Sequence, residues 1–327
     1  MKTSEAFDEF DQALQLDVKE RMAAISLHRQ ITTILTAGDL VADSFLQGSF
    51  RRKTMRSPLH DVDKVLILRD ELRGLSPWDV MGRIETALRP HFPGIAFERT
   101  RHSLKLHLPG QTFTFDAVPA FEMGPETDDV LIANTETGGW DRSNTRHLIR
   151  VVQDRNKAMK GHFVVYVREI KQAAHNLLND QLPGLHVESI AYLAMDGFDK
   201  FVDHPSACQR IFEIGGALLG GQYTDPTGAD VISTRLDPGI ALHARDLFAD
   251  ASLKAGHALA LAEGGDHEAA MAIWFGIFGD PFPKPATQSA GAALGGAFAG
   301  FSVDQGGRVR SEARTHQRAI PTRAWRP

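Results

Sequence analysis

Three aspartates are the residues whose type and spacing could do chemistry in this chain. Asp61 and Asp63 stand one residue apart at the start of the apolar run KVLIL (64–68). Alternate residues of a strand point to one face, so these two carboxylates can share a divalent cation. Asp116 follows the alternating segment TFTF (112–115), which predicts a second strand, and neighbouring strands lie ~5 Å apart. Clustered carboxylates repel one another without cations, and hard oxygen ligands suit Mg²⁺ or Mn²⁺. The three residues predict a two-metal site for phosphoryl transfer.

A Gly-Ser pair upstream of the aspartates supplies a candidate phosphate-binding turn. Gly48 lets the backbone approach a phosphate closely, and Ser49 offers a hydroxyl and an amide. The cations at Arg51 to Lys53 can neutralise a triphosphate. Each feature alone is more often a solvated turn or a polar strand edge. Their occurrence together, in order and at the ends of predicted elements, favours a functional site.

The composition excludes several classes of protein. The 327 residues are 43% hydrophobic and 24% charged, which is ordinary for a globular chain with a real core. A net charge of -5 gives no global basic field, so we expect neither a nucleic-acid activator nor a membrane surface as partner. No apolar run approaches the ~20 residues of a membrane span. The single cysteine, Cys208, cannot form an internal disulfide, and this together with the lack of a signal segment predicts a cytoplasmic location.

The first part of the chain must position the aspartates, and its pattern mixes helices with strands. Apolar residues at helical spacing predict one long amphipathic helix over residues 4–36. Ser76 and Pro77 have the chemistry of a helix start, and the spacing continues through Leu88. Strands are predicted at 44–47, at 64–68 and in a meander of three short alternating segments, IAFERT, SLKLHL and TFTFDAVPAF.

From about Trp140 the pattern becomes helical. Five candidate helices follow, over 141–160, 186–201, 205–219, 237–263 and 266–279. We therefore predict an α+β catalytic lobe with an N-terminal helix over 1–140 and a helical lobe over 141–285. Residues 286–327 are rich in Gly, Ala and Arg and predict a flexible tail.

Three motifs resemble those of a known superfamily. The segments are GSFRRKT (48–54), DVD (61–63) and DAVPA (116–120). They are similar to the motifs of the polymerase-β-like nucleotidyltransferases. Within these, DPTG (225–228), the Ala-rich helix with Glu263 and AMAIWFGIFGDPFP (270–283) resemble the bacterial cGAS/DncV-like nucleotidyltransferases (CD-NTases), which make cyclic oligonucleotide signals in CBASS antiphage systems. The resemblance covers roughly residues 40–285.

The resemblance implies a fold and an activity. The fold would be a central mixed sheet with flanking helices, followed by a helical lobe. Asp61, Asp63 and Asp116 would be catalytic and would hold two Mg²⁺ or Mn²⁺ ions, while Gly48, Ser49, Arg52 and Thr54 would bind the nucleotide phosphates. The enzyme would join ATP and/or GTP into a cyclic di- or trinucleotide and release pyrophosphate. Its partners would be an effector that binds the product and an accessory regulatory protein.

One departure and two alternatives stay open. Family members carry a lysine in a helix reading LVRLLKxWN, and the segment LIRVVQDRNK (148–157) puts Gln153 at that position. Either Arg150, Arg155 or Lys157 substitutes for it, or the phosphate is held differently. A transferase that acts on RNA, a protein or a small molecule is one alternative function. A catalytically inactive nucleotide-binding module is the other. The residues leave the bases, the ring size and the linkage of a cyclic product open.

Overall fold

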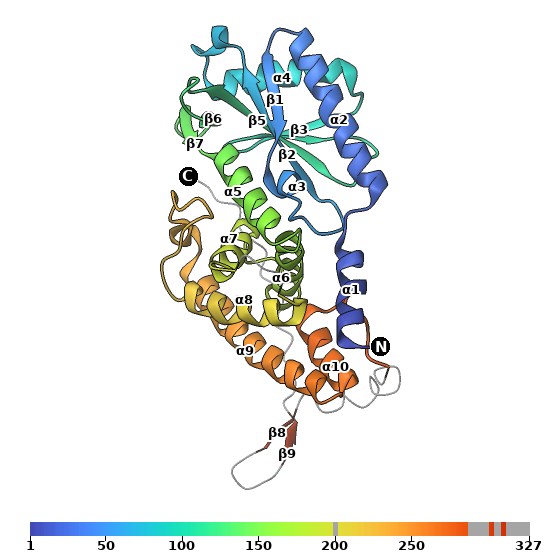
Figure 1. Cartoon of the computed structure of the whole chain (residues 1–327). Coiled ribbons are helices and arrows are strands. Elements are labelled where there is room, and N and C mark those ends of the chain that lie inside the picture. The colour runs from blue at the N-terminus through green and yellow to red at the C-terminus, as the bar shows by residue number, and fades with distance from the viewer. Residues whose placement is uncertain (199–201, 287–300, 304–308, 312–327) are drawn as a thin grey trace. The chain divides into compact units, whose positions relative to one another are not determined.

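The computed structural model describes residues 1–198, 202–286, 301–303 and 309–311. The chain divides into two compact units, Met1–Pro283 and Lys284–Pro327 (Figure 1). In the second unit, β8 (Phe301–Val303) pairs antiparallel with β9 (Val309–Ser311). The rest of the tail that we predicted to be flexible, from residue 287 on, lies outside the described residues.

The first unit contains a mixed seven-stranded sheet. Five strands follow one another in the order β1 (Val41–Leu46), β2 (Asp61–Leu68), β5 (Thr114–Glu122), β4 (Leu104–His107) and β3 (Ala96–Arg99). β2 and β5 run parallel, while β1 and β2 and the β3–β4–β5 meander are antiparallel. β6 (Val130–Asn134) pairs with the end of β5, and β7 (Gly139–Ser143) pairs with β6. The predicted α+β class and the mixed sheet are confirmed.

Two helices pack on the same apolar core as the sheet (Figure 1). α2 (Val18–Ala37) and α4 (Pro77–Leu88) bury apolar residues in one cluster with Val62 and Leu66 of β2. Ser76 caps α4 as predicted, because its hydroxyl accepts a hydrogen bond from the backbone N–H of Asp79 at 3.2 Å. Short 3₁₀ turns, η1 (Asp70–Leu72) and η2 (Arg89–His91), flank this helix. Since Val62 points to this core, Asp61 and Asp63 point to the opposite face of β2.

The predicted single helix over 4–36 is wrong. The chain forms α1 (Thr3–Leu14) and α2, and Asp17 caps the second helix by accepting from Lys19 N at 2.7 Å and Glu20 N at 3.3 Å. The chain breaks between α1 and α2 because the two helices belong to different cores: α1 packs on the helical half and α2 on the sheet half. Phe7 of α1, for example, lies edge-on to Trp274 with a centroid distance of 5.1 Å.

Besides α1, the helical half holds six α-helices and one 3₁₀ turn among the described residues. They are α5 (Thr145–Ala158), α6 (Phe163–Leu178), α7 (Gly184–Ala194), α8 (His204–Leu219), α9 (Pro238–Glu263) and α10 (His267–Phe278), with η3 (Ile232–Arg235) as a short 3₁₀ turn. The helix predicted from 141 begins later, because residues 139–143 form β7 instead. The sequence pattern did not predict β6, β7 or α6. α6 is buried on most sides and opens with the β-branched run FVVYV, so it lacks the polar stripe that marks a surface helix.

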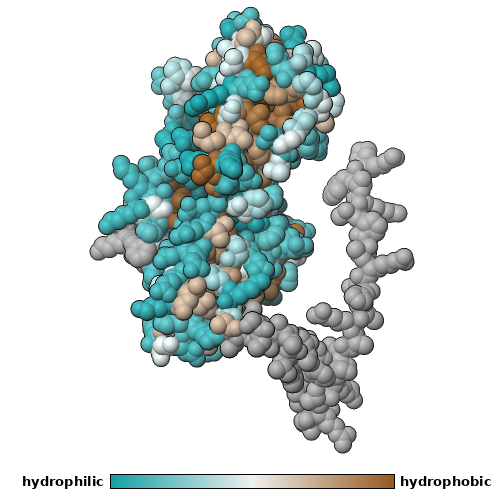
Figure 2. Space-filling model, turned by 90° about the vertical axis from the view of Figure 1, so that its right-hand side faces the viewer, coloured by the Kyte–Doolittle hydropathy of each residue, from teal (hydrophilic) through white to brown (hydrophobic). Residues whose placement is uncertain are grey.

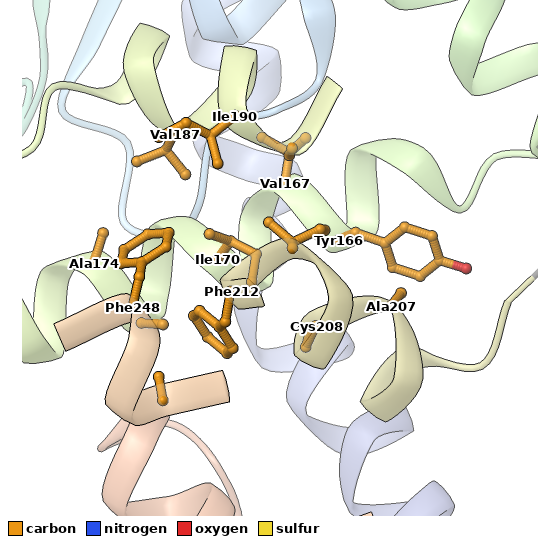
Figure 3. Packing of buried hydrophobic residues seen from close by; sticks show 14 of the residues in the cluster. Tyr166, Val167, Ile170, Ala174, Val187, Ile190, Ala207, Cys208, Phe212 and Phe248 are labelled. Carbon is orange, nitrogen blue, oxygen red and sulfur yellow. The ribbon is translucent and has the colours of Figure 1, made fainter. Parts of the chain in front are cut away.

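Helices α6 to α9 share one apolar core (Figure 3). Ile170 of α6, Ile190 of α7 and Phe212 of α8 belong to this core, and the ring of Phe212 meets Phe248 of α9 edge-on at 5.5 Å between centroids. Cys208 is a buried free thiol in the same core. This core holds α6 and α7, whose residues Lys171, Gly184 and Leu185 line a cavity beside Asp61 and Asp63.

None of the helices in the part of the chain that the structure describes is long and apolar enough to cross a membrane. On the face shown in Figure 2, apolar surface gathers over the sheet half, whereas the helical half presents mainly hydrophilic residues.

Candidate active site

The three aspartates lie together near the N-terminal ends of two neighbouring strands. The parallel register of β2 and β5 places Asp63 beside Asp116, and Asp61 beside Thr114. Asp61 and Asp63 alternate with buried Val62, so their side chains share the face of the sheet that α2 and α4 leave uncovered. Asp61 is exposed, and the other two are partly buried. The structure therefore brings together the three residues that the sequence singled out.

The electrostatics of this cluster disfavour three full negative charges. Burial, together with the charges of Asp61 and Asp116, raises the pKa of Asp63 to about 6 against the opposing effect of Arg52. Burial also raises the pKa of Asp116 above its usual range, although Lys105, 3.8 Å away, opposes that change. One carboxylate oxygen of Asp116, Oδ1, is buried without a hydrogen-bond partner. A bound cation would relieve each of these costs.

The donor set fits a hard divalent cation. Among the described residues no group of three or more His, Cys, Asp or Glu side chains already surrounds a single ion position. The three aspartates nevertheless offer only oxygen ligands, and burial raises the pKa values of two of them. With the orphaned Oδ1 of Asp116, these properties fit Mg²⁺ or Mn²⁺, and Asp61, Asp63 and Asp116 are the residues that would hold it.

The Gly-Ser turn is fixed directly beside Asp63. The backbone N–H of Gln47 donates to the carbonyl of Asp63 at 2.9 Å, and α3 (Gly48–Arg52) starts at the next residue. Gly48 has φ +63°, and a Cβ at this position would lie 1.7 Å from Oδ2 of Asp63. Both the left-handed backbone and the close approach require glycine here. The turn and the catalytic strand therefore form one rigid unit.

Two cavities meet at Asp63. One, of about 390 Å³, is lined by Gly48, Ser49, Arg52, Met55, Arg56, Pro58, His60, Asp61, Asp63, Lys171, Asp180, Gly184 and Leu185. The other, of about 320 Å³, is lined by Asp116, Asn144, Thr145, Asp225 and Arg235, among other residues. The first cavity combines cations with the Gly-Ser turn, which suits a triphosphate. The second gives a second molecule access to the same aspartates.

Arg52 and Thr54 are engaged by a carboxylate from the helical half. Nε of Arg52 donates to Oε1 of Glu188 at 2.5 Å, and the hydroxyl of Thr54 donates to Oε2 at 2.6 Å. Thr54 is fully buried and does not line the first cavity, whereas Arg52 does. The other two cations of the turn, Arg51 and Lys53, line a separate cavity and not the first one. The cationic cluster therefore does not face the triphosphate cavity as one group.

Lys171 of α6 is the lysine that lines the first cavity, and the sequence reading missed it. Gln153, the residue that the sequence reading placed at the family's lysine position, does not line this cavity, because α5 contributes no residue to it. Of the proposed substitutes, Arg150 pairs with Asp128 and Arg155 pairs with Asp196. The signal was present in VREIK (167–171), which has the same Arg-x-x-Lys spacing as the family pattern.

The pKa of Lys171 is set by two opposing effects, burial and nearby carboxylates. Burial lowers the pKa of its ammonium group to about 8, while the nearby carboxylates of Glu188 and Asp61 limit that decrease. The ammonium nitrogen lies 3.8 Å from Oε2 of Glu188 and 3.5 Å from the hydroxyl of Thr54. Lys171 can therefore present a positive charge to an anion in the cavity at neutral pH.

A mixed sheet with three carboxylates on neighbouring strands and a Gly-Ser turn beside them is the arrangement expected from the resemblance to the polymerase-β-like nucleotidyltransferases. Comparison with known proteins agrees with this class. Residues 1–156 match the model of the Second Messenger Oligonucleotide or Dinucleotide Synthetase domain. The chain is 23% identical over 272 residues to the Probable cyclic nucleotide synthase IK1_05630 of Bacillus cereus, which covers 72% of this chain and 81% of the relative.

Solved structures show the same fold. CdnC of E. coli MS115-1 with ATP matches with a TM-score of 0.65 and 20% identity, over 85% of this chain and 98% of CdnC. CdnG of Bradyrhizobium diazoefficiens, in complex with GTP, matches with a TM-score of 0.67 and 13% identity, over 85% of this chain and 95% of CdnG. The chain is therefore similar in its first 156 residues to second-messenger synthetase domains, and it has the fold of the cGAS/DncV-like nucleotidyltransferases.

We predict that Ser49→Ala weakens donor binding more than it slows turnover. If the hydroxyl meets a phosphate, its loss costs on the order of 1 to 3 kcal/mol, because a charge-assisted hydrogen bond disappears. The apparent KM for the nucleotide should rise accordingly in steady-state assays. An unchanged KM and rate would reduce Gly48-Ser49 to a structural turn.

Proposed function

We propose that this enzyme joins ATP and/or GTP into a cyclic di- or trinucleotide, with pyrophosphate as the second product, as a signal in antiphage defence. One observation carries the proposal: the cavity that holds Ser49 and Lys171 opens onto Asp61 and Asp63, and a second cavity reaches the same centre beside Asp116. This arrangement suits a donor triphosphate on one side and an acceptor hydroxyl on the other.

The residues of the chain divide the work between binding and proton transfer. The backbone and hydroxyl of Gly48-Ser49 bind phosphate oxygens, and Lys171 and Arg56 supply positive charge along the donor cavity. Asp116 lies on the acceptor side with a raised pKa, so its carboxylate can accept the proton of a ribose hydroxyl. Most of the rate enhancement comes from positioning and charge stabilisation, as expected for phosphoryl transfer.

Two Mg²⁺ or Mn²⁺ ions complete the proposed site. When bound by Asp61, Asp63 and Asp116, they would neutralise phosphate charge and make the acceptor hydroxyl more acidic. The oxygen-only donor set and the raised pKa values of Asp63 and Asp116 support this choice of metal.

The proposed partners follow from the family and from the charge. CdnC has been solved in complex with HORMA-deltaN, which supports an accessory regulatory protein here. A cyclic product requires an effector that binds it. We expect no nucleic-acid activator, because the net charge of -5 gives no general attraction to phosphate backbones.

The experiment that tests the function uses labelled nucleotides. Purified protein is incubated with α-labelled ATP and GTP, singly and together, with Mg²⁺ or Mn²⁺, and the products are treated with phosphatase. A cyclic product has no terminal phosphate and resists the treatment. Products that stay phosphatase-sensitive, or transfer only when RNA or a small-molecule acceptor is added, would favour the alternative transferase. Nucleotide binding without any product would favour the inactive module.

Lys171 gives the proposal a pH dependence. Its pKa of about 8 means that the free enzyme loses this charge as the pH rises through about 8, so donor kcat/KM should fall there. A Lys171→Arg variant keeps its charge at all these pH values and should lack this fall. The measurement is kcat/KM for the donor between pH 6.5 and 9.5 for both proteins. The same decline in both would exclude Lys171 as its source.

A further inference from the structure

We propose that Glu188 is a positioning residue that sets the affinity for the donor nucleotide by holding the phosphate-binding turn and Lys171 together. The inference rests on the proposed function and assigns a role to a residue that no sequence motif singled out. Glu188 lies on α7 in the helical half, whereas the turn that it holds belongs to the sheet half.

The contacts of Glu188 use both of its carboxylate oxygens. Oε1 accepts from Nε of Arg52 at 2.5 Å, and Oε2 accepts from the hydroxyl of Thr54 at 2.6 Å. The ammonium group of Lys171 lies 3.8 Å from Oε2. Glu188 therefore links residues of α3, its following segment and α6, three elements that the chain brings together from positions far apart.

The charges explain why a glutamate stands at this fully buried position. Burial alone would raise the pKa of Glu188, but Arg52 and Lys171 outweigh that effect and hold it below the usual range. In return, the Glu188 carboxylate limits the loss of charge on Lys171. Without it, two cations would face each other in a buried space, and Lys171 would be driven to the neutral form.

The geometry explains why the effect should fall on donor binding. The start of the turn is tied to the catalytic strand by the bond from Gln47 N to the carbonyl of Asp63. Its end is tied by Arg52 and Thr54 to Glu188. Ser49 lies between these two ties, and Lys171 faces it across the same cavity. Removing the second tie lets the turn and the lysine shift relative to each other, and shifts of about 1 Å are costly at such sites.

The test compares two isosteric substitutions of buried glutamates. Glu188→Gln removes the charge at the turn. Glu169→Gln is the matched control, because Glu169 is also fully buried in the helical half but contacts His204 and Cys208 and lines neither of the two cavities. We expect both variants to lose thermal stability. Donor KM, and the Kd of a non-hydrolysable ATP or GTP analogue, should rise roughly tenfold to a hundredfold in Glu188→Gln alone.

Folding is checked by circular dichroism at the assay temperature. If Glu188→Gln does not fold, the pair Thr54→Val and Thr54→Ser replaces it, because these variants differ in the hydroxyl that reaches Glu188. The valine variant should then bind the analogue more weakly than the serine variant.

The outcomes separate this inference from the proposed function. Weaker analogue binding confined to folded Glu188→Gln, or to Thr54→Val, supports the positioning role. Equal losses in Glu188→Gln and Glu169→Gln, or unchanged binding in both, overturn it and leave a purely structural contact. A wild-type protein that binds no ATP or GTP analogue at all contradicts the proposed function first, and the role of Glu188 in donor affinity with it.

Discussion

Asp61→Asn combined with Asp63→Asn is expected to abolish nucleotide transfer, with a loss of at least ~10³-fold, or ~4 kcal/mol of transition-state stabilisation. The two substitutions remove the ligands that β2 supplies to the proposed cation site. Asp116 on β5 would then be a single carboxylate, which is insufficient to hold two ions. The measurement is product formation from labelled ATP and GTP with Mg²⁺ or Mn²⁺. Turnover at the wild-type rate would refute the metal assignment.

The same double variant should keep its fold and gain stability when metal is absent. The pKa of Asp63 is raised in the folded state, so its stabilising contribution is complete below the unfolded value near 4 and is lost as the pH rises through about 6. At pH 7.5 the wild-type protein therefore carries a repulsion that the variant lacks. In EDTA, thermal unfolding should show a higher Tm for the variant, and the difference should narrow as the pH falls below about 6. A lower Tm at pH 7.5 would contradict this electrostatic account.

Gly48→Ala is expected to reduce donor turnover roughly a hundredfold while the protein still folds. The new Cβ would lie 1.7 Å from Oδ2 of Asp63, so either the turn or the aspartate must move. The left-handed φ of +63° adds about 1 kcal/mol of strain. Both effects act on the contact between the phosphate-binding turn and the catalytic strand.

Gly138→Ala is the control that separates the backbone strain of Gly48→Ala from its steric clash with Asp63. Gly138 also has a left-handed φ, +71°, but a Cβ there would meet nothing within 4 Å. This control should lose a similar small amount of stability and retain full turnover. The comparison uses kcat/KM for the donor together with the Tm of each variant. Equal activity of both variants would show that the close approach of Gly48 to Asp63 is not needed.

The sequence predicted those parts of the fold that leave a local signal. Strand β2 is a continuous apolar run, and α4 opens with a Ser-Pro cap, so both were predicted close to their observed positions. The opening helix was predicted as one because its apolar spacing continues past Gln15, and only the two separate cores reveal the break at Asp17. α6 was missed because a helix buried on most sides loses the periodicity that identifies it.

In the candidate site too, residues that belong to a local motif were predicted and residues from distant helices were not. Asp61, Asp63 and Gly48-Ser49 lie within one short segment, and Asp116 follows an alternating strand pattern, so their spacing alone pointed to phosphate chemistry. Lys171 and Glu188 come from helices more than a hundred residues beyond the segment that holds Gly48 to Asp63. Their roles depend on how the sheet half and the helical half pack together. The contacts of Arg52 and Thr54 were likewise not predictable from the motif, since Nε of Arg52 and the hydroxyl of Thr54 donate to Glu188 on a distant helix.

Mass spectrometry of the phosphatase-resistant product tests the central claim most directly. Wild-type protein, ATP, GTP and Mg²⁺ should yield a species whose mass equals a whole number of nucleoside monophosphate units less one water for each linkage, including the one that closes the ring. The Asp61→Asn, Asp63→Asn variant should yield none. A linear product, which after phosphatase treatment is lighter than the cyclic species by one HPO₃ less one water, or the same cyclic product from the variant, would contradict the account of this site as a cyclic nucleotide synthase centre built on Asp61 and Asp63.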